Sequence, residues 1–358
     1  MTKTERDFLL KLLNTPSPTG FEISGQKVWA AYNRKHADSV QNDAYGNTWA
    51  VVNGAKKGTP TVMIEAHADE IGYMIKHITD EGFLYLDRIG GTDWATGRGR
   101  RLTLFGDKGE IPGVIGNTAI HIREDLSKAP KVHELFVDVG AKNDKEVAKM
   151  GLRVGHPAVY SDSAEFFGKN HIVGRALDNR IGGFIISQVL KRLAAKKGPA
   201  PDSTCVALNA IQEEIGGYGA KMASYRLMPD VCLCLDVTHA TDSPGIESKK
   251  HGKVELGGGP GLTHGTANHP LVVERLMDVA KKQKIDLQHE ASSRYTGTDT
   301  DSIYHIQSGI PSALVSLPLR YMHSVVEMAD LEDVEEVIKL MAGFVHSVKK
   351  GDSFAHVV

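Results

Sequence analysis

The chain has few of the features that mark secreted, membrane or nucleic-acid-binding proteins. Its 358 residues include three cysteines, Cys205, Cys232 and Cys234, and none of them forms a Cys-x-x-Cys pair. An odd number of cysteines is a poor disulfide framework, so we expect buried thiols in a reducing cytoplasm. No apolar run approaches the roughly 20 residues that cross a bilayer. Residues 1–6 contain no apolar signal core, so we expect a cytoplasmic protein without a secretion signal.

Charge of either sign is not in excess. Lys and Arg number 42, Asp and Glu number 44, and the formal net charge is -2. This balance predicts neither nucleic acid nor an anionic membrane as the partner. Aromatic residues make up only 6%, whereas glycines number 37, which is typical of many short elements joined by tight turns. With 41% apolar residues, the chain is long enough to form two domains with sizeable cores.

The middle of the chain differs from the rest in its pattern of apolar residues and glycines. Between residues 72 and 165, short strand-like runs recur between glycines, at 83–86, 101–105 and 111–115. This texture predicts a small β-rich domain inserted into the chain, with a short helix over 144–150. Extra strands of the main sheet are the alternative. Under the first interpretation, residues 1–71 and 166–358 form one discontinuous main domain.

The flanking parts alternate between strands and helices, which predicts an α/β sandwich. Strands are expected at 61–65, 205–211, 231–237 and 312–317. Helices are expected at 6–13, 22–36, 179–195, 220–226, 270–283 and 331–349.

Polar residues appear repeatedly where an apolar strand ends, which is where α/β proteins place their sites. His67 follows the first strand, and Asp69 is placed to orient its imidazole as a metal ligand. A hydrogen-bonded histidine at a capped strand end is the alternative. Asp178 precedes the helix at 179–195 and could bridge two cations. However, a helix N-cap role for Asp178 or Asn179 is common.

Three further acids and a histidine fit the same pattern. Glu213 and Glu214 follow a buried strand, and neighbours in extended chain point to opposite sides, so one could face a metal and the other the substrate. A solvated acidic loop is the alternative. Asp236 lies within an apolar strand, where an acid is costly unless it is coordinated, paired or bound by backbone amides. His323 also follows a strand, and by itself it would more often be structural.

Together these positions supply two histidines and several carboxylates. Such nitrogen and oxygen ligand sets suit Zn²⁺, Co²⁺ or Mn²⁺. Hydrolases that use two metals hold the ions roughly 3.5–4 Å apart, often through a shared carboxylate and water. The ligand types therefore indicate a two-metal hydrolase.

The segments that carry these residues resemble the tetrahedral aminopeptidases, metallopeptidase family forty-two (M42). That family includes glutamyl aminopeptidases and proteins described as endoglucanase M. The matching segments are 66–72, 176–180, 212–216, 235–238, 297–299 and 321–324. They occur in the family's order and span almost the whole chain.

The resemblance implies a role for each candidate residue. It makes Asp178 the bridging ligand and Glu213 the catalytic base, with Asp69 orienting His67. The implied metal ligands are His67, Asp178, Glu214, Asp236 and His323. His67 and Asp236 would bind different metals, and so would Glu214 and His323. The implied cofactors are two divalent ions per subunit, Zn²⁺ or Co²⁺, with Mn²⁺ as an alternative.

The resemblance also implies an architecture and a substrate. It indicates an α/β/α sandwich of the zinc-peptidase type with a mixed sheet, and an inserted β-barrel-like dimerisation domain. It implies a cis peptide bond between Asp178 and Asn179, and dimers that assemble into a dodecamer. The substrates would be peptides with a free N-terminus, and residues 297–299 would lie near the substrate pocket. The side-chain preference stays open among acidic, aliphatic and basic residues.

Three other functions compete with an aminopeptidase. A deacylase or carboxypeptidase could use the same two metals. A glycosidase would need two carboxylates about 5–9.5 Å apart across one bond. Glu213 and Glu214 are adjacent and expected to diverge, and the two histidines would have no role there. A non-catalytic peptide-binding shell would be expected to lack the base or a ligand, and the sequence retains all of them.

Overall fold

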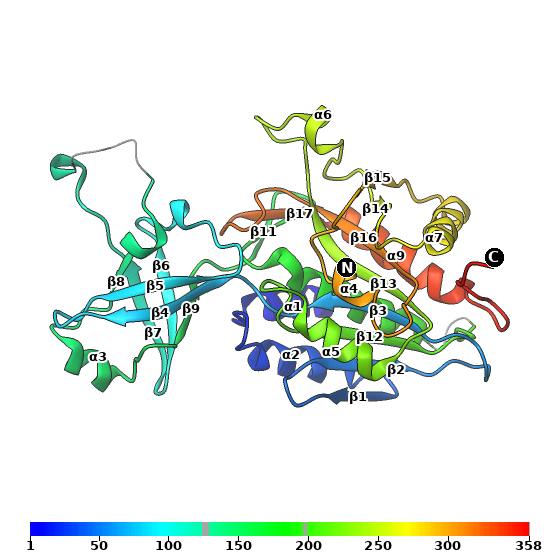
Figure 1. Ribbon diagram of the computed structural model, residues 1–358, viewed down its shortest axis with the longest axis horizontal. Helices are drawn as coiled ribbons and strands as arrows, with labels where there is room; N and C mark the ends of the chain where they lie inside the picture. Colours follow the sequence, from blue (N-terminus) through cyan, green and yellow to red (C-terminus); the bar gives the residue numbers. More distant parts are fainter. Residues whose placement is uncertain (124–128, 196–198, 358) are drawn as a thin grey trace.

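The larger part of the molecule is built around a mixed sheet of eight strands (Figure 1). The computed structural model describes residues 1–123, 129–195 and 199–357. The strand order is β1-β2-β12-β3-β13-β16-β14-β15. The strands are β1 (Ser39–Asn42), β2 (Thr48–Val52), β3 (Val62–His67), β12 (Cys205–Ala210), β13 (Val231–His239), β14 (Gly261–His264), β15 (Gln288–Ala291) and β16 (Ser312–Leu319). The four central strands β12, β3, β13 and β16 run parallel, so their carboxyl ends meet at one edge.

Helices cover both faces of this sheet. One face carries α1 (Lys3–Asn14), α2 (Ile23–Asn33), α4 (Leu177–Leu193), α7 (Pro270–Gln283) and α9 (Leu331–Ser347). The other carries α5 (Tyr218–Leu227) and α8 (Thr300–Ile303), while α6 (Ser248–His251) lies apart from the sheet. In β13, Leu233 and Leu235 belong to the first core and Cys232 and Cys234 to the second. This period-two alternation buries both faces, so the predicted α/β/α sandwich is confirmed.

The three cysteines are free and buried, as the sequence predicts. All three lie in central strands, Cys205 in β12 and Cys232 and Cys234 in β13. Burial raises the pKa of the Cys205 thiol above its usual range, which makes it an apolar packing group. Among the helices that the structure describes, none is long and apolar enough to span a membrane.

A closed barrel with the strand order β4-β5-β8-β7-β6-β9 lies beside the sandwich (Figure 1). Its strands are β4 (Gly72–Ile78), β5 (Leu84–Ile89), β6 (Arg101–Gly106), β7 (Gly109–Ile115), β8 (Phe136–Asp138) and β9 (Pro157–Tyr160). The predicted short helix is α3 (Asp144–Met150). The barrel has its own apolar core, and its described strands pair only with one another. The alternative of extra strands in the main sheet is therefore wrong.

A third sheet of three strands packs against the sandwich through β17. It consists of β10 (Glu165–Phe167), β11 (His171–Gly174) and β17 (Glu327–Asp330). The sequence-based limits at residues 71/72 and 165/166 stay a prediction, although the second of them falls inside β10. The chain leaves β3 at His67 and enters the barrel at Gly72, which brings the barrel close to the edge where the central strands end.

Candidate active site

The structure brings all the candidate residues to the carboxyl edge of the central strands. His67 ends β3, Asp236 lies near the end of β13, and Glu213 follows β12. Asp178 lies at the start of α4, where it and Asn179 have non-helical backbone angles and their shared peptide bond is cis, as the resemblance implied. A pocket of about 770 Å³ opens at this edge. Its lining includes Asp178, Glu213, Glu214, Asp236 and His323.

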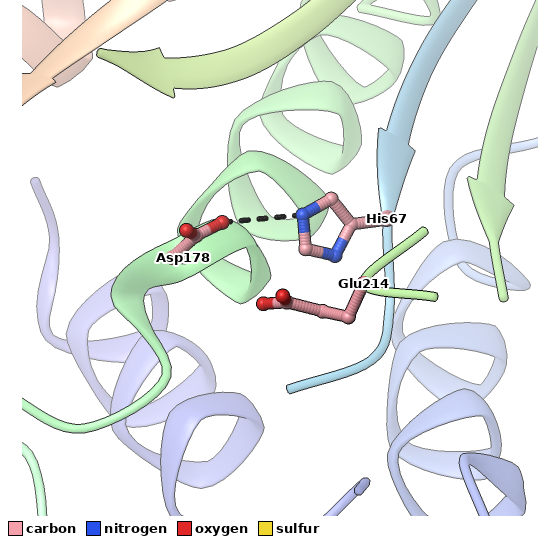
Figure 2. A group of neighbouring side chains, drawn as sticks. All are labelled: His67, Asp178 and Glu214. Carbon is pink, nitrogen blue, oxygen red and sulfur yellow. Dashed lines mark hydrogen bonds and ion pairs between the residues drawn. The ribbon is translucent and has the colours of Figure 1, made fainter. Parts of the chain in front are cut away.

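Asp178 lies between the two histidines. One of its oxygens, Oδ1, is 3.2 Å from His67 Nε2, and the other, Oδ2, is 3.2 Å from His323 Nε2. Figure 2 shows the Asp178 carboxylate facing the His67 ring, with Glu214 directed into the same space. A carboxylate that presents one oxygen to each of two imidazoles has the geometry of a bridging ligand.

The other two acids lie on opposite sides of this bridge. Asp236 Oδ1 is 3.7 Å from His67 Nε2, whereas Glu214 Oε2 is 3.6 Å from His323 Nε2. This grouping places His67 with Asp236 and His323 with Glu214, in contrast to the pairing implied by the resemblance. His67, Asp178 and Glu214 also offer ligand atoms that all lie within 4.8 Å of one another, so the two halves are contiguous.

The second nitrogen of each histidine is engaged by a backbone carbonyl. His67 Nδ1 lies 3.2 Å from the carbonyl oxygen of Asp69, and His323 Nδ1 lies 3.1 Å from that of Gly91. With Nδ1–H donating to a carbonyl, each ring presents the lone pair of Nε2 to the site. Gly91 lies between β5 and β6, so the polypeptide of the barrel helps to orient a histidine of the sandwich.

Asp69 has a wider structural role than the sequence suggested. Its carboxylate is 3.5 Å from His67 Nδ1 and also accepts hydrogen bonds from the backbone amides of Glu213 (3.0 Å) and Glu214 (3.2 Å). The hydroxyl of Thr19 donates a further one at 2.8 Å. Asp69 therefore connects His67 with the loop that carries both glutamates, and it is completely buried.

The two adjacent glutamates are not arranged as extended chain would place them. They do not continue an extended strand, because the backbone turns at Gln212, whose φ is 59°. They lie in the turn that follows, where Glu213 Oε2 is 3.8 Å from His67 Nε2 and Glu214 faces His323. Both side chains enter the same pocket from this turn, which is held by the Asp69 carboxylate.

The pocket places several buried carboxylates close together, and their negative charges need a counter-charge. Burial raises the pKa of Glu213 to about 8, and with the Asp178 charge nearby it raises the pKa of Glu214 well above its usual range. Burial also raises the pKa of Asp236. Burial opposes ionisation of Asp178 too, but hydrogen bonds with His323 and His67 hold the pKa of Asp178 below its usual range.

One of these oxygens has no partner of its own. Glu214 Oε1 is buried and has no hydrogen bond within residues 1–123, 129–195 and 199–357. A buried carboxylate oxygen in that state is costly unless a cation or a proton satisfies it. A donor set of two imidazoles and several carboxylates, with an acceptor to spare, fits divalent transition-metal ions.

Sequence reasoning missed Glu327, which binds the backbone of two proposed metal ligands. Its carboxylate accepts the backbone amide of Asp178 at 3.1 Å and that of His323 at 2.8 Å. Glu327 begins β17 and is 1% exposed. Only the pairing of Gly174 with Glu327 between β11 and β17 brings this acid beside Asp178. An acid four residues after His323 was the only local signal.

A family model and the similar proteins of known sequence both indicate aminopeptidases. The family model described as M42 glutamyl aminopeptidase matches residues 46–340. The chain is 33% identical over 352 residues to a lysyl aminopeptidase of Pyrococcus furiosus, covering 97% of this chain and 98% of the relative.

Two solved structures show the same fold. An aminopeptidase of the archaeon Desulfurococcus kamchatkensis superposes with a TM-score of 0.90 at 34% identity, covering 97% of this chain and 96% of the other. The TET1 peptidase of Pyrococcus horikoshii, described as assembling into a tetrahedron or a large octahedral shell, gives a TM-score of 0.84 at 25% identity. That match covers 96% of this chain and all of the other.

Proposed function

This chain belongs to the M42 aminopeptidase family, and we propose that it removes N-terminal residues from peptides with two divalent metal ions and a glutamate base. The observation that carries this proposal is the Asp178 carboxylate, which presents one oxygen to His67 and the other to His323. The chain would hold one ion with His67, Asp178 and Asp236 and the other with His323, Asp178 and Glu214. Zn²⁺ and Co²⁺ suit these ligands, with Mn²⁺ as an alternative.

The bound ions would lower the pKa of an attacking water and polarise the substrate carbonyl. Glu213 is not assigned as a ligand in this proposal, but it lies near the ligands and its side chain lines the pocket. It accepts the proton of the attacking water and then donates it to the leaving amine. Asp69 keeps Glu213 in place through the backbone amide and holds the adjacent His67 ring.

The competing functions receive less support. A glycosidase would leave the two histidines and the bridging geometry of Asp178 without a role. A deacylase or carboxypeptidase could use the same ligands, but the relatives reported above are aminopeptidases. Their names refer to glutamyl and to lysyl residues, so membership of the family leaves the side-chain preference open.

We also propose that the barrel mediates contacts between subunits, as dimers that assemble into a dodecamer. The TET1 peptidase is a relative that can assemble into a tetrahedron or a large octahedral shell. On this chain, the exposed apolar side chains of the barrel region include Val114 at 46%, Ile120 at 61% and Ile122 at 75%. Burial of these side chains against another subunit would remove apolar surface from water. A cytoplasmic location stays a prediction.

The role of Glu213 can be tested with a near-isosteric substitution. Glu213→Gln should retain bound metal but lower the hydrolysis of aminoacyl-nitroanilides by about 10²–10⁴-fold, because the amide cannot accept the proton. Metal content is measured by elemental analysis, and Glu274→Gln on the exposed face of α7 is the control with the same charge change.

Removal of metal is the companion measurement. Treatment with EDTA should abolish hydrolysis in both the unmodified protein and the control, and added Zn²⁺, Co²⁺ or Mn²⁺ should restore it. Turnover by Glu213→Gln close to that of the unmodified protein would contradict the assigned base. Activity that survives EDTA treatment would contradict the metal mechanism altogether.

A further inference from the structure

A second cavity adjoins the pocket that holds the proposed metal ligands. Its volume is about 400 Å³. Four residues line both spaces: Val237, Thr238, Thr296 and Thr298. A side cavity of this size beside the reacting centre has room for a long amino-acid side chain.

Glu290 is the acidic residue in the lining of this cavity. It lies on the edge strand β15, yet its Oε1 accepts a hydrogen bond of 2.6 Å from the hydroxyl of Thr238 on β13. The sheet order places β14 and β16 between these two strands, so the carboxylate extends inward across the sheet face. Asp236, a proposed metal ligand, precedes Thr238 by two residues on the same face of β13.

A glycine in β14 leaves the space that this carboxylate occupies. A Cβ atom added at Gly261 would lie 2.6 Å from Glu290 Oε2, closer than unbonded atoms tolerate. Any larger residue at this position would push the carboxylate out of its place. The absence of a side chain at Gly261 therefore allows the Glu290 carboxylate to point toward the metal pocket.

The carboxylate lacks a positive partner of its own. Glu290 Oε2 is buried and has no hydrogen bond in the described part of the chain. No Lys, Arg or His nitrogen lies within 4.0 Å of it among those residues. The remaining polar group that faces it is the Ser316 hydroxyl, and burial raises the pKa of Glu290. A carboxylate buried in this way is stabilised by a cation that brings its own charge.

The walls and the depth of the cavity suit a long aliphatic stem that ends in a charge. Val237 and Leu314 supply apolar lining, which can cover the methylenes of such a side chain. Two residues of strand rise separate Asp236 from Thr238, about 7 Å. That separation is comparable to the reach of the four-methylene stem of lysine. Arg294, the cation in the lining, is exposed, and its guanidinium lies over the Tyr295 ring at 5.0 Å.

We propose that this cavity receives the side chain of the substrate's first residue and that Glu290 selects a cationic side chain there, lysine above all. This inference rests on the proposed aminopeptidase function. The selectivity comes from an ion pair between the substrate's ammonium group and the Glu290 carboxylate. Gly261 leaves the space that this carboxylate occupies.

The test compares two substrates that differ only in the ammonium group. The ratio of kcat/KM for lysyl-p-nitroanilide to that for norleucyl-p-nitroanilide is measured for the metal-loaded protein. We expect the ratio to be well above one. Glu290→Gln should lower it by about 10- to 100-fold, the loss expected for a charge-assisted hydrogen bond.

A second variant separates position from charge. Gly261→Ala keeps the carboxylate but displaces it, and it should also lower the ratio. Glu274→Gln, which makes the same charge change on the exposed face of α7, should leave the ratio as it is. Inhibition of norleucyl-p-nitroanilide hydrolysis by free L-lysine, compared with inhibition by L-norleucine, measures binding without turnover of a lysyl substrate. The variants should weaken only the inhibition by lysine.

Several outcomes would overturn the inference. If the unmodified protein hydrolyses norleucyl or glutamyl substrates at least as well as lysyl ones, Glu290 does not select a cation, although the aminopeptidase function stands. The same holds if Glu290→Gln and Gly261→Ala keep the lysyl to norleucyl ratio of the unmodified protein. If no aminoacyl-nitroanilide is hydrolysed with any of the three metals, the proposed function and this inference fail together.

Discussion

Replacing Glu327 by glutamine should loosen the metal site without removing any ligand. The Glu327 carboxylate accepts the amides of Asp178 and His323 at 3.1 and 2.8 Å, and it is 1% exposed. Glutamine has the same shape but offers one oxygen and one NH₂ group. One of the two backbone amides would therefore lose its acceptor and face another donor.

The magnitude follows from that single lost contact. A hydrogen bond to a charged group contributes about 1.5–3 kcal/mol, which corresponds to about 10- to 150-fold in an equilibrium constant. Because the two amides belong to the bridging Asp178 and to His323, this loss should appear in metal affinity. Substitution of residues that support ligands typically weakens metal binding by about 10–100-fold. We therefore expect Glu327→Gln to bind Zn²⁺ about 10- to 100-fold more weakly.

The assay is a Zn²⁺ titration of metal-free protein against a competing chelator, with the unfolding temperature of the metal-free protein measured in parallel. Glu274→Gln again provides the charge-matched control. A residue that supports only the fold would lower the unfolding temperature and leave the affinity of the folded protein unchanged. A Zn²⁺ Kd within about twofold of the unmodified value, in a folded variant, would refute the reasoning.

Two further predictions concern stability. Burial opposes ionisation of Glu5, but hydrogen bonds from Lys191 and Thr2 lower the pKa of Glu5 to about 2. Its stabilising effect is therefore present above its unfolded pKa near 4.5 and is lost as the pH falls toward 2. The difference in unfolding temperature between the unmodified protein and Glu5→Gln should shrink over that range, and a constant difference would contradict the assignment. Phe184 is fully buried in α4, so Phe184→Ala should lower the free energy of unfolding by about 3–5 kcal/mol, as measured by urea unfolding. Phe184→Leu should cost clearly less, and equal losses would argue against a cavity effect.

Local pattern was sufficient for most of the sandwich. The helix predicted over 270–283 coincides with α7, and the strand predicted over 231–237 is the first part of β13. These elements follow from side-chain periodicity, which depends only on near neighbours in sequence. Boundaries were less well predicted where the backbone is irregular. The helix predicted to begin at Asn179 is preceded by a kink, since Asp178 and Asn179 have non-helical backbone angles within the bounds of α4.

The β-rich texture between residues 72 and 165 indicated strands but could not decide their pairing. The closed order β4-β5-β8-β7-β6-β9 joins strands from opposite ends of that segment, such as β4 with β9. Such contacts depend on long-range register and not on local composition. The resemblance to a known family supplied the barrel-like expectation, which the closed barrel confirms.

The sequence by itself determined which residues could supply the chemistry. His67, Glu213, Glu214, Asp236 and His323 could be recognised because polar groups stand out where apolar strands end. The tertiary structure decided how they are grouped around Asp178, with His67 beside Asp236 and His323 beside Glu214.

Tertiary structure also decided which distant residues complete the pocket. Glu327 reaches Asp178 through the pairing of β17 with β11, and Glu290 reaches Thr238 across two intervening strands. Neither acid lies next to its partner in the chain, and neither has a distinctive local pattern. The physical reason is that a side chain's identity is local, whereas the direction in which it points and the groups it meets depend on how strands far apart in sequence are ordered and aligned.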